Sequence, residues 1–452
     1  MLLLDDLFFI WHGASAHTRL LMLFLCVSTV TTLLYVMSRS RTVYIVDYAC
    51  YRPNSKYRIS KDAWIENIHH SWSYDDNSNH CFLARISERS GLGDETYLPS
   101  CHHHIPPYNC LSEARVEAEL SIFTTIDDLL VKTSINLDAI AILIVNCSLF
   151  NTTPSLADMI MQRYRLRENI CSVQLSGMGC SAGLIAVGLA KDLLQNAPSN
   201  AHALVVSTEI LTGTYYTGRK REMQLTDMLF RMGGSAVLLS TSSSNARFEL
   251  AHVIRNCTSS DDNAYQCVFY EEDDEGILGL NLSKNLVHVA GKALEDNITM
   301  VGPLILPLSV KIAFSLSFIS QKVRYGTTKP CLPDFRKAFD HLCIHAGGRA
   351  VIDAVQHSLC LLDEHVEPSR MTLHKFGNTS SSSVWYELAY SEVKGRMSKG
   401  DRVWMIGFGS GYKCNSVVLN CIQPAKYADK AWRGCIYRYP IDVPKEVYNM
   451  VR

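Results

Sequence analysis

The sequence lacks several patterns that would assign it to a common class of protein. None of its 16 cysteines forms a CxxC pair, so neither a zinc ribbon nor a thioredoxin motif is expected. The 43 Lys and Arg residues nearly balance the 44 Asp and Glu residues, and no long basic run occurs. This balance argues against a protein that binds nucleic acid by neutralising phosphates. No low-complexity linker interrupts residues 42–452, and no repeat of about 20–50 residues is visible.

What the sequence does contain is a large apolar fraction. Hydrophobic residues make up 47% of the 452 residues, which is ample for a large core and excludes global disorder. The cysteine density is far below that of a disulfide scaffold. We therefore expect mostly buried free thiols and a globular protein that faces a reducing compartment, the cytosol.

An uncharged apolar run lies near the N-terminus. Residues 20–37 carry no charge, and as a helix at about 1.5 Å per residue they would reach ~27 Å, just enough to cross a bilayer. Arg39 and Arg41 follow the run and only Arg19 stands before it, so the positive-inside rule places the rest of the chain in the cytosol. A signal peptide or a buried core helix is the alternative. We expect residues 1–41 to anchor the protein in a membrane, with one crossing or a re-entrant hairpin left open.

After residue 41, short apolar runs alternate with helical patterns. Three runs in the first part are apolar on both faces, as buried central strands are: 139–145, 203–206 and 236–239. Helical patterns lie between such runs, at 112–130 and 184–194. A polar run after Ser240 predicts a loop near the midpoint, so we expect two halves, 42–245 and 246–452. The second half shows the same alternation of apolar runs and helical patterns, which predicts a strand over 342–345, a helix from about Arg349 and a strand over 402–406. The pattern predicts an α/β architecture of layered sheets and helices.

The segment LSGMGCSAG, residues 175–183, contains the strongest candidate nucleophile. Cys180 is surrounded by glycine and alanine, which permit a sharp turn, and a helical pattern follows it. Unpaired N–H groups and the helix dipole at a helix N-terminus favour a thiolate, the reactive form of cysteine. A strand, a tight turn and a helix that expose a nucleophile are used in covalent catalysis. The alternative is a buried cysteine in a tight helix start, which fits most of the other 15.

Three later segments offer partners for such a nucleophile. His345 ends a strand just before a Gly-Gly turn, and MTLHKFGNTSSSS supplies His374 and Asn378 in a polar, turn-rich stretch. A glycine-rich loop that could approach a substrate closely contains Gly407, Gly409 and Gly411. A single histidine is more often structural than catalytic, so each histidine alone is weak evidence. The triplet at 102–104 lacks a second ligand pair at zinc-finger spacing, so no metal site is expected there.

Nine motifs occur in one order after about residue 42. They are VYIVDYACYRP, SGLGDETYLP, ILIVNCSLFNTTPSL, LSGMGCSAGL, ALVVSTEI, LFRMGG, CIHAGGRAVID, MTLHKFGNTSSSSVWYELAY and GDRVWMIGFGSGYKCNS. Through these motifs the sequence resembles plant 3-ketoacyl-CoA synthases, the condensing enzymes of very-long-chain fatty acid elongation. Residues 211–228 depart from the family pattern, in which a proline and an LPNC-like stretch are expected, and members usually have two N-terminal spans.

The resemblance implies a thiolase-like fold of two similar α/β halves with the active site between them. It implies that Cys180 is the acyl-accepting nucleophile and that His345 and Asn378 complete a triad. His374 falls in a family motif and is expected to be a supporting residue. Phe230 is expected to be a gatekeeping aromatic residue beside the reaction centre.

The resemblance also implies the substrates and the setting. These are a long-chain acyl-CoA and malonyl-CoA, with no metal or redox cofactor, and a catalytic part that faces the cytosol at the endoplasmic reticulum membrane. Other enzymes of the elongase complex and a second copy of the chain, in a homodimer, are the expected partners. Two alternatives stay open at this stage: a non-catalytic paralogue that modulates elongase partners, and a polyketide synthase of the chalcone type.

Overall fold

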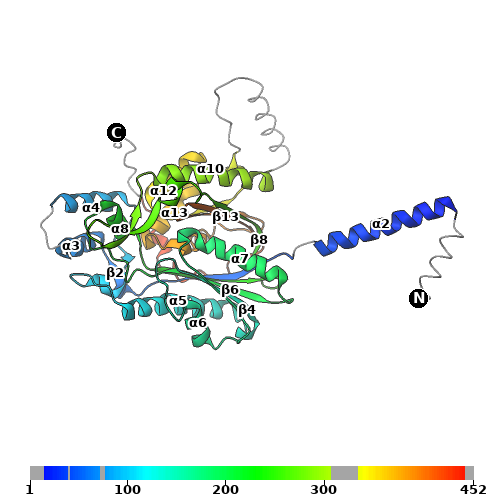
Figure 1. Ribbon diagram of the computed structural model, residues 1–452, viewed down its shortest axis with the longest axis horizontal. Coiled ribbons are helices and arrows are strands. Elements are labelled where there is room, and N and C mark those ends of the chain that lie inside the picture. The colour runs from blue at the N-terminus through cyan, green and yellow to red at the C-terminus, as the bar shows by residue number, and fades with distance from the viewer. Residues whose placement is uncertain (1–14, 39–40, 72–76, 307–333, 443–452) are drawn as a thin grey trace, which may run out of the picture. The chain divides into compact units, whose positions relative to one another are not determined.

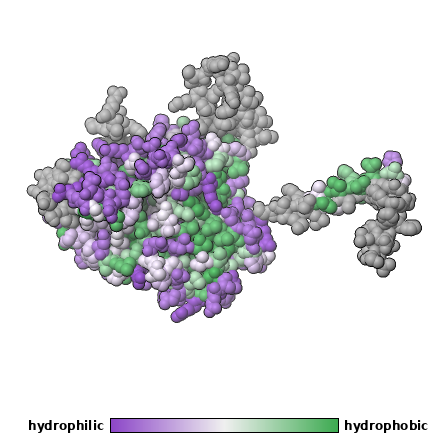
Figure 2. All heavy atoms as spheres, in the orientation of Figure 1, coloured by the Kyte–Doolittle hydropathy of each residue, from purple (hydrophilic) through white to green (hydrophobic). Residues whose placement is uncertain are grey.

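The computed structural model describes residues 15–38, 41–71, 77–306 and 334–442 (Figure 1). Two compact units are formed, by residues 1–42 and by residues 43–452. The described part of the first unit is the helix α2 (Ala16–Ser38), on which apolar side chains such as Leu20 and Phe24 are exposed (Figure 2). Within the described ranges, no helix combines the length and the apolar character that a membrane crossing requires. The predicted span over residues 20–37 is therefore not confirmed.

The second unit is built on one mixed sheet of nine strands. Across the sheet they run β11 (His341–Ile344), β12 (Arg402–Gly409), β13 (Lys413–Cys421), β8 (Phe248–Cys257), β1 (Tyr44–Cys50), β7 (Gly233–Ser240), β6 (His202–Glu209), β4 (Ile140–Asn146) and β5 (Cys171–Leu175). Strand β4 is parallel to β5 and β6, and β11 is parallel to β12, while the other pairs are antiparallel. The sheet therefore has parallel ends and an antiparallel middle.

The apolar runs become the buried strands that the sequence predicts. All eight residues of β7 are buried, and six of the seven residues of β4 are. Burial on both faces is typical of central strands covered by helices on each side. Strands from the two predicted halves meet where β1 pairs with β8, at Tyr44 opposite Glu249 and Ile45 opposite Phe248. The boundary between residues 245 and 246 stays a prediction, because both parts lie in one compact unit.

Helices cover the sheet on both sides, which confirms the α/β class (Figure 1). Against β1, β6 and β7 packs α5 (Leu111–Thr133), and α6 (Leu156–Tyr164) packs against β4 and β5. Against β8 and β13 packs α10 (Leu286–Ile305), α13 (Asp363–Phe376) packs against β11, and α12 (Arg349–Ser358) lies between α10 and α13. The remaining helices are α3 (Lys61–Ser71), α4 (Asn77–Arg89), α8 (Arg221–Leu229) and α9 (Asp262–Tyr265). Two small sheets pair β2 (Arg58–Ile59) with β3 (Thr96–Tyr97) and β9 (Val268–Glu272) with β10 (Leu278–Leu282).

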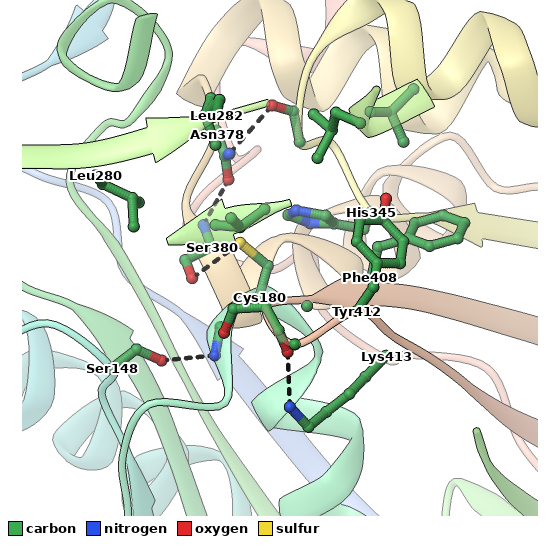
Figure 3. A pocket seen from close by; sticks show the side chains of 18 of the residues that line it. Ser148, Cys180, Leu280, Leu282, His345, Asn378, Ser380, Phe408, Tyr412 and Lys413 are labelled. Carbon is green, nitrogen blue, oxygen red and sulfur yellow. Dashed lines mark hydrogen bonds between the residues drawn. The ribbon is translucent and has the colours of Figure 1, made fainter. Parts of the chain in front are cut away.

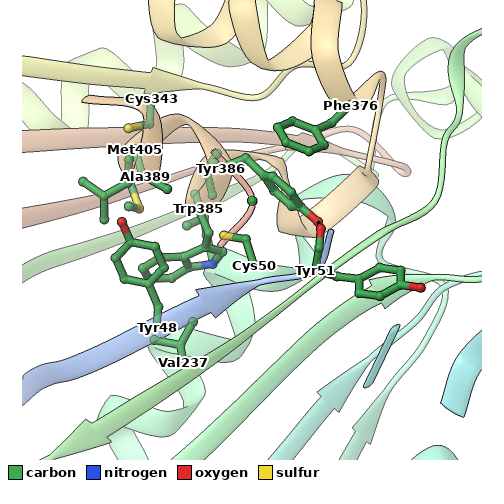
Figure 4. Close-up of a cluster of buried hydrophobic side chains, with 14 of the residues drawn as sticks. Tyr48, Cys50, Tyr51, Val237, Cys343, Phe376, Trp385, Tyr386, Ala389 and Met405 are labelled. Atoms are coloured by element: carbon green, nitrogen blue, oxygen red, sulfur yellow. Dashed lines mark hydrogen bonds between the residues drawn. The ribbon is translucent and has the colours of Figure 1, made fainter. Parts of the chain in front are cut away.

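Two central helices contact strands of both predicted halves. They are α7 (Ala182–Asn196), which packs against β4, β6, β8 and β13, and α14 (Ser383–Val393), which packs against β1, β7, β11 and β12. Residues 383–391 of α14 are all buried, and its Trp385, Tyr386 and Ala389 pack into a core with Tyr48 of β1 (Figure 4). The two helices therefore begin inside the molecule, so the residues directly before each helix also lie in the interior.

Candidate active site

A cavity of about 600 Å³ lies where the starts of α7 and α14 meet the ends of several strands (Figure 3). Six of the predicted site residues line it: Cys180, His345, Asn378, Phe230, Gly409 and Gly411. They come from segments that are up to about 230 residues apart in the chain. The fold thus brings most of the predicted site together in one place.

The nucleophile candidate lies in a single 3-10 turn, η4 (Gly179–Ser181), directly before α7. Gly177 and Gly179 both have positive φ, at 67° and 66°, which glycine adopts without a steric penalty. A side chain at Gly183 would lie 2.4 Å from the Ser381 carbonyl oxygen, so the start of α7 packs directly on the turn before α14. Cys180 is therefore placed at a helix N-terminus, as the sequence predicts.

The electrostatic setting of Cys180 differs from the simple expectation of a thiolate. Burial raises the pKa of the Cys180 thiol to about 12, while a hydrogen bond from Ser380 opposes the rise and the charge of Glu209 adds to it. Desolvation is the largest cause, because a charged sulfur loses its hydration when it is buried. In the resting protein Cys180 is a thiol, so a neighbouring group must take its proton before it can attack.

His345 directly follows β11 and is 4% exposed. Its Nδ1 atom lies 2.7 Å from the Ser383 hydroxyl, at the first residue of α14. Burial lowers the pKa of His345 to about 4, so the ring is neutral at pH 7. When Ser383 donates to Nδ1, the proton of the neutral ring lies on Nε2, which can then donate a hydrogen bond in the cavity.

Asn378 follows α13 and is fixed on both sides by main-chain groups. Its side-chain Nδ2 donates to the Gly347 carbonyl at 3.1 Å, and its Oδ1 accepts from the Ser380 N–H at 2.8 Å. Its main chain pairs with Leu229 and Arg231 on either side of Phe230. One amide hydrogen of Asn378 remains for the cavity, so His345 and Asn378 supply two neutral donors.

Comparisons with known proteins agree with this geometry. Residues 35–323 match the family described as FAE1/Type III polyketide synthase-like protein, and residues 336–421 match the C-terminal domain of 3-oxoacyl-[acyl-carrier-protein] synthase III. The chain is 52% identical to 3-ketoacyl-CoA synthase 5 of Arabidopsis thaliana, over 94% of this chain and 86% of that protein. It is also 52% identical to 3-ketoacyl-CoA synthase 6 of the same plant, over 91% and 84%.

The chain belongs to the 3-ketoacyl-CoA synthase family. Its fold resembles a fungal type III polyketide synthase, with a TM-score of 0.64 over 84% of this chain and 99% of that one, at 18% identity. A mutant of CsyB gives the same TM-score at 20% identity, over 84% of this chain and 100% of that one. At such low identity these likenesses show the fold, and they confirm the predicted thiolase-like α/β class.

Two predicted residues of this 3-ketoacyl-CoA synthase family member do not line the cavity. His374 lies in α13, where its Nδ1 is 3.4 Å from the Tyr439 hydroxyl and its carbonyl accepts from the Gly93 N–H. Gly407 lies within β12, and a side chain there would meet Leu184 at 3.1 Å. Gly409 also lies in β12 rather than in a loop, and a side chain there would lie 2.5 Å from the Met178 carbonyl oxygen. The glycines therefore let β12 pack against the turn that holds Cys180.

Three polar residues of the site were not predicted from the sequence: Glu209, Ser380 and Ser383. Glu209 ends β6, and the two serines start the segment into α14. The serine run after Asn378 is visible in the sequence, but nothing in it distinguishes a hydroxyl that faces Cys180 from one that faces the core. Glu209 and Ser380 are 171 positions apart in the chain, so no local pattern predicts their contact.

An apolar wall of the same cavity was also not predicted. It consists of side chains from β9, β10 and α10: Val268, Tyr270, Leu280, Leu282 and Val287. The acidic run 271–274 lies at the end of β9 and in the turn to β10. Among the described residues, no three His, Cys, Asp or Glu side chains are grouped as metal ligands would be. That the family member uses no metal stays a prediction.

Proposed function

We propose that this chain condenses a long-chain acyl-CoA with malonyl-CoA to give a 3-ketoacyl-CoA two carbons longer. The observation that supports this most directly is that Cys180, His345 and Asn378 line one cavity together with apolar side chains of β9, β10 and α10. A polar reaction centre beside an apolar wall suits a substrate with a reactive thioester at one end and a hydrocarbon chain behind it. Membership of the 3-ketoacyl-CoA synthase family supports the same reaction.

The first step in this proposal is transfer of the acyl group. The Cys180 thiolate attacks the thioester carbonyl of the acyl-CoA, a bond forms between sulfur and carbon, and the CoA thiolate leaves with the carbon–sulfur bonding pair. The product is a thioester on Cys180, with the alkyl chain along Leu280 and Leu282. Covalent capture splits one difficult step into two easier ones.

The second step forms the new carbon–carbon bond. Malonyl-CoA loses CO₂, and the electron pair of the broken bond becomes an enolate whose oxygen accepts hydrogen bonds from His345 Nε2 and Asn378 Nδ2. Neutral donors aimed at a developing oxyanion stabilise the transition state. The enolate carbon attacks the Cys180 thioester, the 3-ketoacyl-CoA is released and the cysteine thiolate is restored. This sequence of steps calls for no metal or redox cofactor.

The apolar N-terminal helix supports a proposed location at the cytosolic face of the endoplasmic reticulum membrane. Leu20, Phe24 and Val27 on α2 are more than half exposed, and exposed apolar side chains of this kind favour a lipid surface. Flotation of the full chain with vesicles, compared with a chain that starts at Val43, tests the attachment. Recovery of both forms in the vesicle-free fraction would contradict it.

A second copy of the chain and other elongase enzymes are the proposed protein partners. The edge strand β5 supports the homodimer, because its residues are only half-buried or exposed and a bare sheet edge can pair with another strand. In the described chain the buried side-chain nitrogen and oxygen of Gln174 on β5 have no hydrogen-bond partner. Sedimentation of the purified protein measures the oligomeric state.

An elongation assay tests the proposed reaction. Microsomes from a host that expresses the chain receive labelled malonyl-CoA and a panel of long-chain acyl-CoA primers, beside the Cys180→Ala variant and a matched Cys81→Ala control. Cys81 is exposed on α4, away from the cavity, so this control should retain full activity. We expect product that disappears only in Cys180→Ala. No product from any primer, with the protein folded, would instead support the non-catalytic paralogue, and products extended repeatedly without ketoreduction would support a polyketide synthase.

A further inference from the structure

One short turn contacts two of the three proposed catalytic residues. It is the 3-10 turn η6 (Ser380–Ser382), which lies just after Asn378. The Ser380 hydroxyl donates to the Cys180 sulfur at 3.4 Å, and the Ser380 N–H donates to Oδ1 of Asn378 at 2.8 Å (Figure 3). Ser380 has a φ of +53°, which residues with a side chain rarely adopt. Such a conformation persists only where the surrounding structure holds it.

The same turn leads directly to the residue that orients the third. Ser383 follows η6 as the first residue of α14, and its hydroxyl lies 2.7 Å from Nδ1 of His345. The three catalytic side chains come from separate segments of the chain, and η6 is the element next to all of them. A shift of η6 would therefore displace the hydrogen-bond partners of Cys180, His345 and Asn378 together.

The turn is tied to the strands of the large sheet by one buried amide, that of Asn146. This residue ends β4 and is 0% exposed. Its Oδ1 accepts the hydroxyl of Ser381, the middle residue of η6, at 2.6 Å. Its Nδ2 donates to the Ser207 hydroxyl at 2.7 Å and to the Val206 carbonyl at 3.2 Å, both on β6. The amide thus joins a turn of the second predicted half to two strands of the first.

The surroundings of this amide are dry and closely packed. Asn146, Ser207 and Ser381 are all less than 5% exposed. A side chain at Gly183 of α7 would lie 2.4 Å from the Ser381 carbonyl oxygen and 3.2 Å from the Ser207 hydroxyl. Packing against α7 keeps the turn close to the sheet, whereas a directional hydrogen bond also fixes its orientation. A buried hydroxyl that loses its partner has no water to replace it.

We propose that Asn146 is a positioning residue, which fixes η6 through Ser381 and so aligns the catalytic groups. Neither Asn146 nor Ser381 lines the cavity, so both act through the turn rather than on the substrate. When η6 is free to shift, the Ser380 hydroxyl moves from the Cys180 sulfur. The pKa of the thiol then rises further, because that hydrogen bond lowers it. The effect on condensation rests on the function proposed above, but the effect on the thiol does not require substrate.

Ser381→Ala is the main test variant. It removes one hydroxyl and leaves the bonds from Asn146 to β6 in place, so the fold should persist. Asn146→Ala removes the whole link, and the double variant completes a double-mutant cycle. If both residues act through the same hydrogen bond, the double variant should be no more impaired than Asn146→Ala. Ser381→Ala decides the question by itself if Asn146→Ala does not fold.

A second buried pair of the same kind supplies the matched control. Asn297 on α10 donates to the Cys414 carbonyl at 2.8 Å and accepts the hydroxyl of Ser416, and both Asn297 and Ser416 are 0% exposed. Neither residue lines the cavity. The Ser416 hydroxyl also accepts from Trp404 Nε1, so Ser416→Ala should destabilise the protein at least as much as Ser381→Ala. It does so without affecting η6.

Alkylation of Cys180 by iodoacetamide across a range of pH measures the alignment without substrate. The peptide that contains Cys180 is followed by mass spectrometry, because other cysteines are exposed as well. Thermal unfolding of each variant measures its stability, and the elongation assay gives kcat and KM. A wild-type chain that is alkylated but yields no product would contradict the proposed function, while the alkylation comparison would still decide the role of Asn146.

We expect Ser381→Ala and Asn146→Ala to be alkylated about threefold more slowly at neutral pH, with the pH profile displaced upward by roughly half a unit. Their kcat should fall about tenfold while KM stays near the wild-type value. Ser416→Ala should match the wild type in both measurements despite a lower Tm. The same displacement in Ser416→Ala would overturn the proposal, because general loss of stability would then explain it. A wild-type profile in Ser381→Ala would overturn it too, and so would a double variant more impaired than Asn146→Ala.

Discussion

The two walls of the cavity are built in different ways. The polar wall consists of Cys180, His345, Asn378 and the residues around them, after β11 and α13 and at the starts of α7 and α14. The apolar wall belongs to the two-stranded sheet of β9 and β10 and to α10, outside the nine-stranded sheet. Reacting atoms need fixed positions, which a hydrogen-bonded and closely packed frame provides, whereas a hydrocarbon chain needs only apolar volume.

The exposed fraction of the side chains also differs between the polar wall and the apolar wall. Asn378, Ser380 and His345 are each less than 5% exposed, while Tyr270 on β9 is 47% exposed. Side chains of the polar wall are held by hydrogen bonds to one another and to the main chain, and those of the apolar wall pack mainly by contact area. We therefore expect changes in the polar wall to lower the rate, and changes in the apolar wall to alter which chain is accepted.

The largest effect is expected from the neutral donors of the polar wall. Replacing Asn378 or His345 by Ala should lower kcat for condensation by about 10²–10³-fold, the usual cost of one oxyanion donor. The acyl group should still load onto Cys180, because the thioester forms before the enolate does. Intact-mass measurement of the acylated protein, beside the elongation assay, separates the two steps. Loss of acyl loading in both variants would show that these residues act earlier than proposed.

A smaller effect is expected from the group that orients His345. In Ser383→Ala the Nδ1 atom loses its partner at 2.7 Å, so the ring can change tautomer or rotate. Partners of this kind usually contribute about tenfold or more to the function of the group that they orient. We expect kcat to fall by roughly that factor, and KM for acyl-CoA to remain near its wild-type value. A rise in KM with unchanged kcat would mean that Ser383 shapes binding instead.

The smallest effect on rate, with a change in product, is expected in the apolar wall. Leu280, together with Leu149, Phe230 and Tyr270, lines both the main cavity and a second, much smaller one of about 20 Å³. Leu280→Ala should join the two cavities, so the distribution of chain lengths should move by at least one elongation step toward longer products. Leu282→Ala is the matched control, because Leu282 lines the main cavity and not the second. Chromatography of the products from both variants measures the shift, and equal distributions would contradict the proposed role of Leu280.

The second cavity also shows where residues 211–228, which were expected to depart from the family pattern, lie in the fold. Leu211, Thr214, Thr226 and Asp227 of this segment line the second cavity, behind Phe230. None of these four residues lines the main cavity with Cys180. The divergence therefore lies beyond the end of the apolar wall rather than at the reacting groups.

Local features were predictable from the sequence to within a few residues. The run 139–145 became β4 at Ile140–Asn146, and the pattern at 112–130 became α5 at Leu111–Thr133. Hydrophobic periodicity reports which side chains are buried, and a glycine-rich turn before a helix limits where Cys180 can lie. The hairpin of β9 and β10 was not predicted, because neither of its five-residue strands contains a long apolar run.

The sequence by itself determined the α/β class, the positions of several strands and helices such as β4 and α5, and the placement of Cys180 at the start of a helix. Each of these depends on side chains that are neighbours along the chain, so a local pattern contains the information. Only the tertiary structure decided that the Ser380 hydroxyl contacts both Cys180 and Glu209, and that His374 contacts Tyr439. Only the tertiary structure decided that burial raises the pKa of the Cys180 thiol. Those outcomes depend on desolvation and on contacts between segments more than about 60 residues apart, which exist only after the helices and strands have packed together.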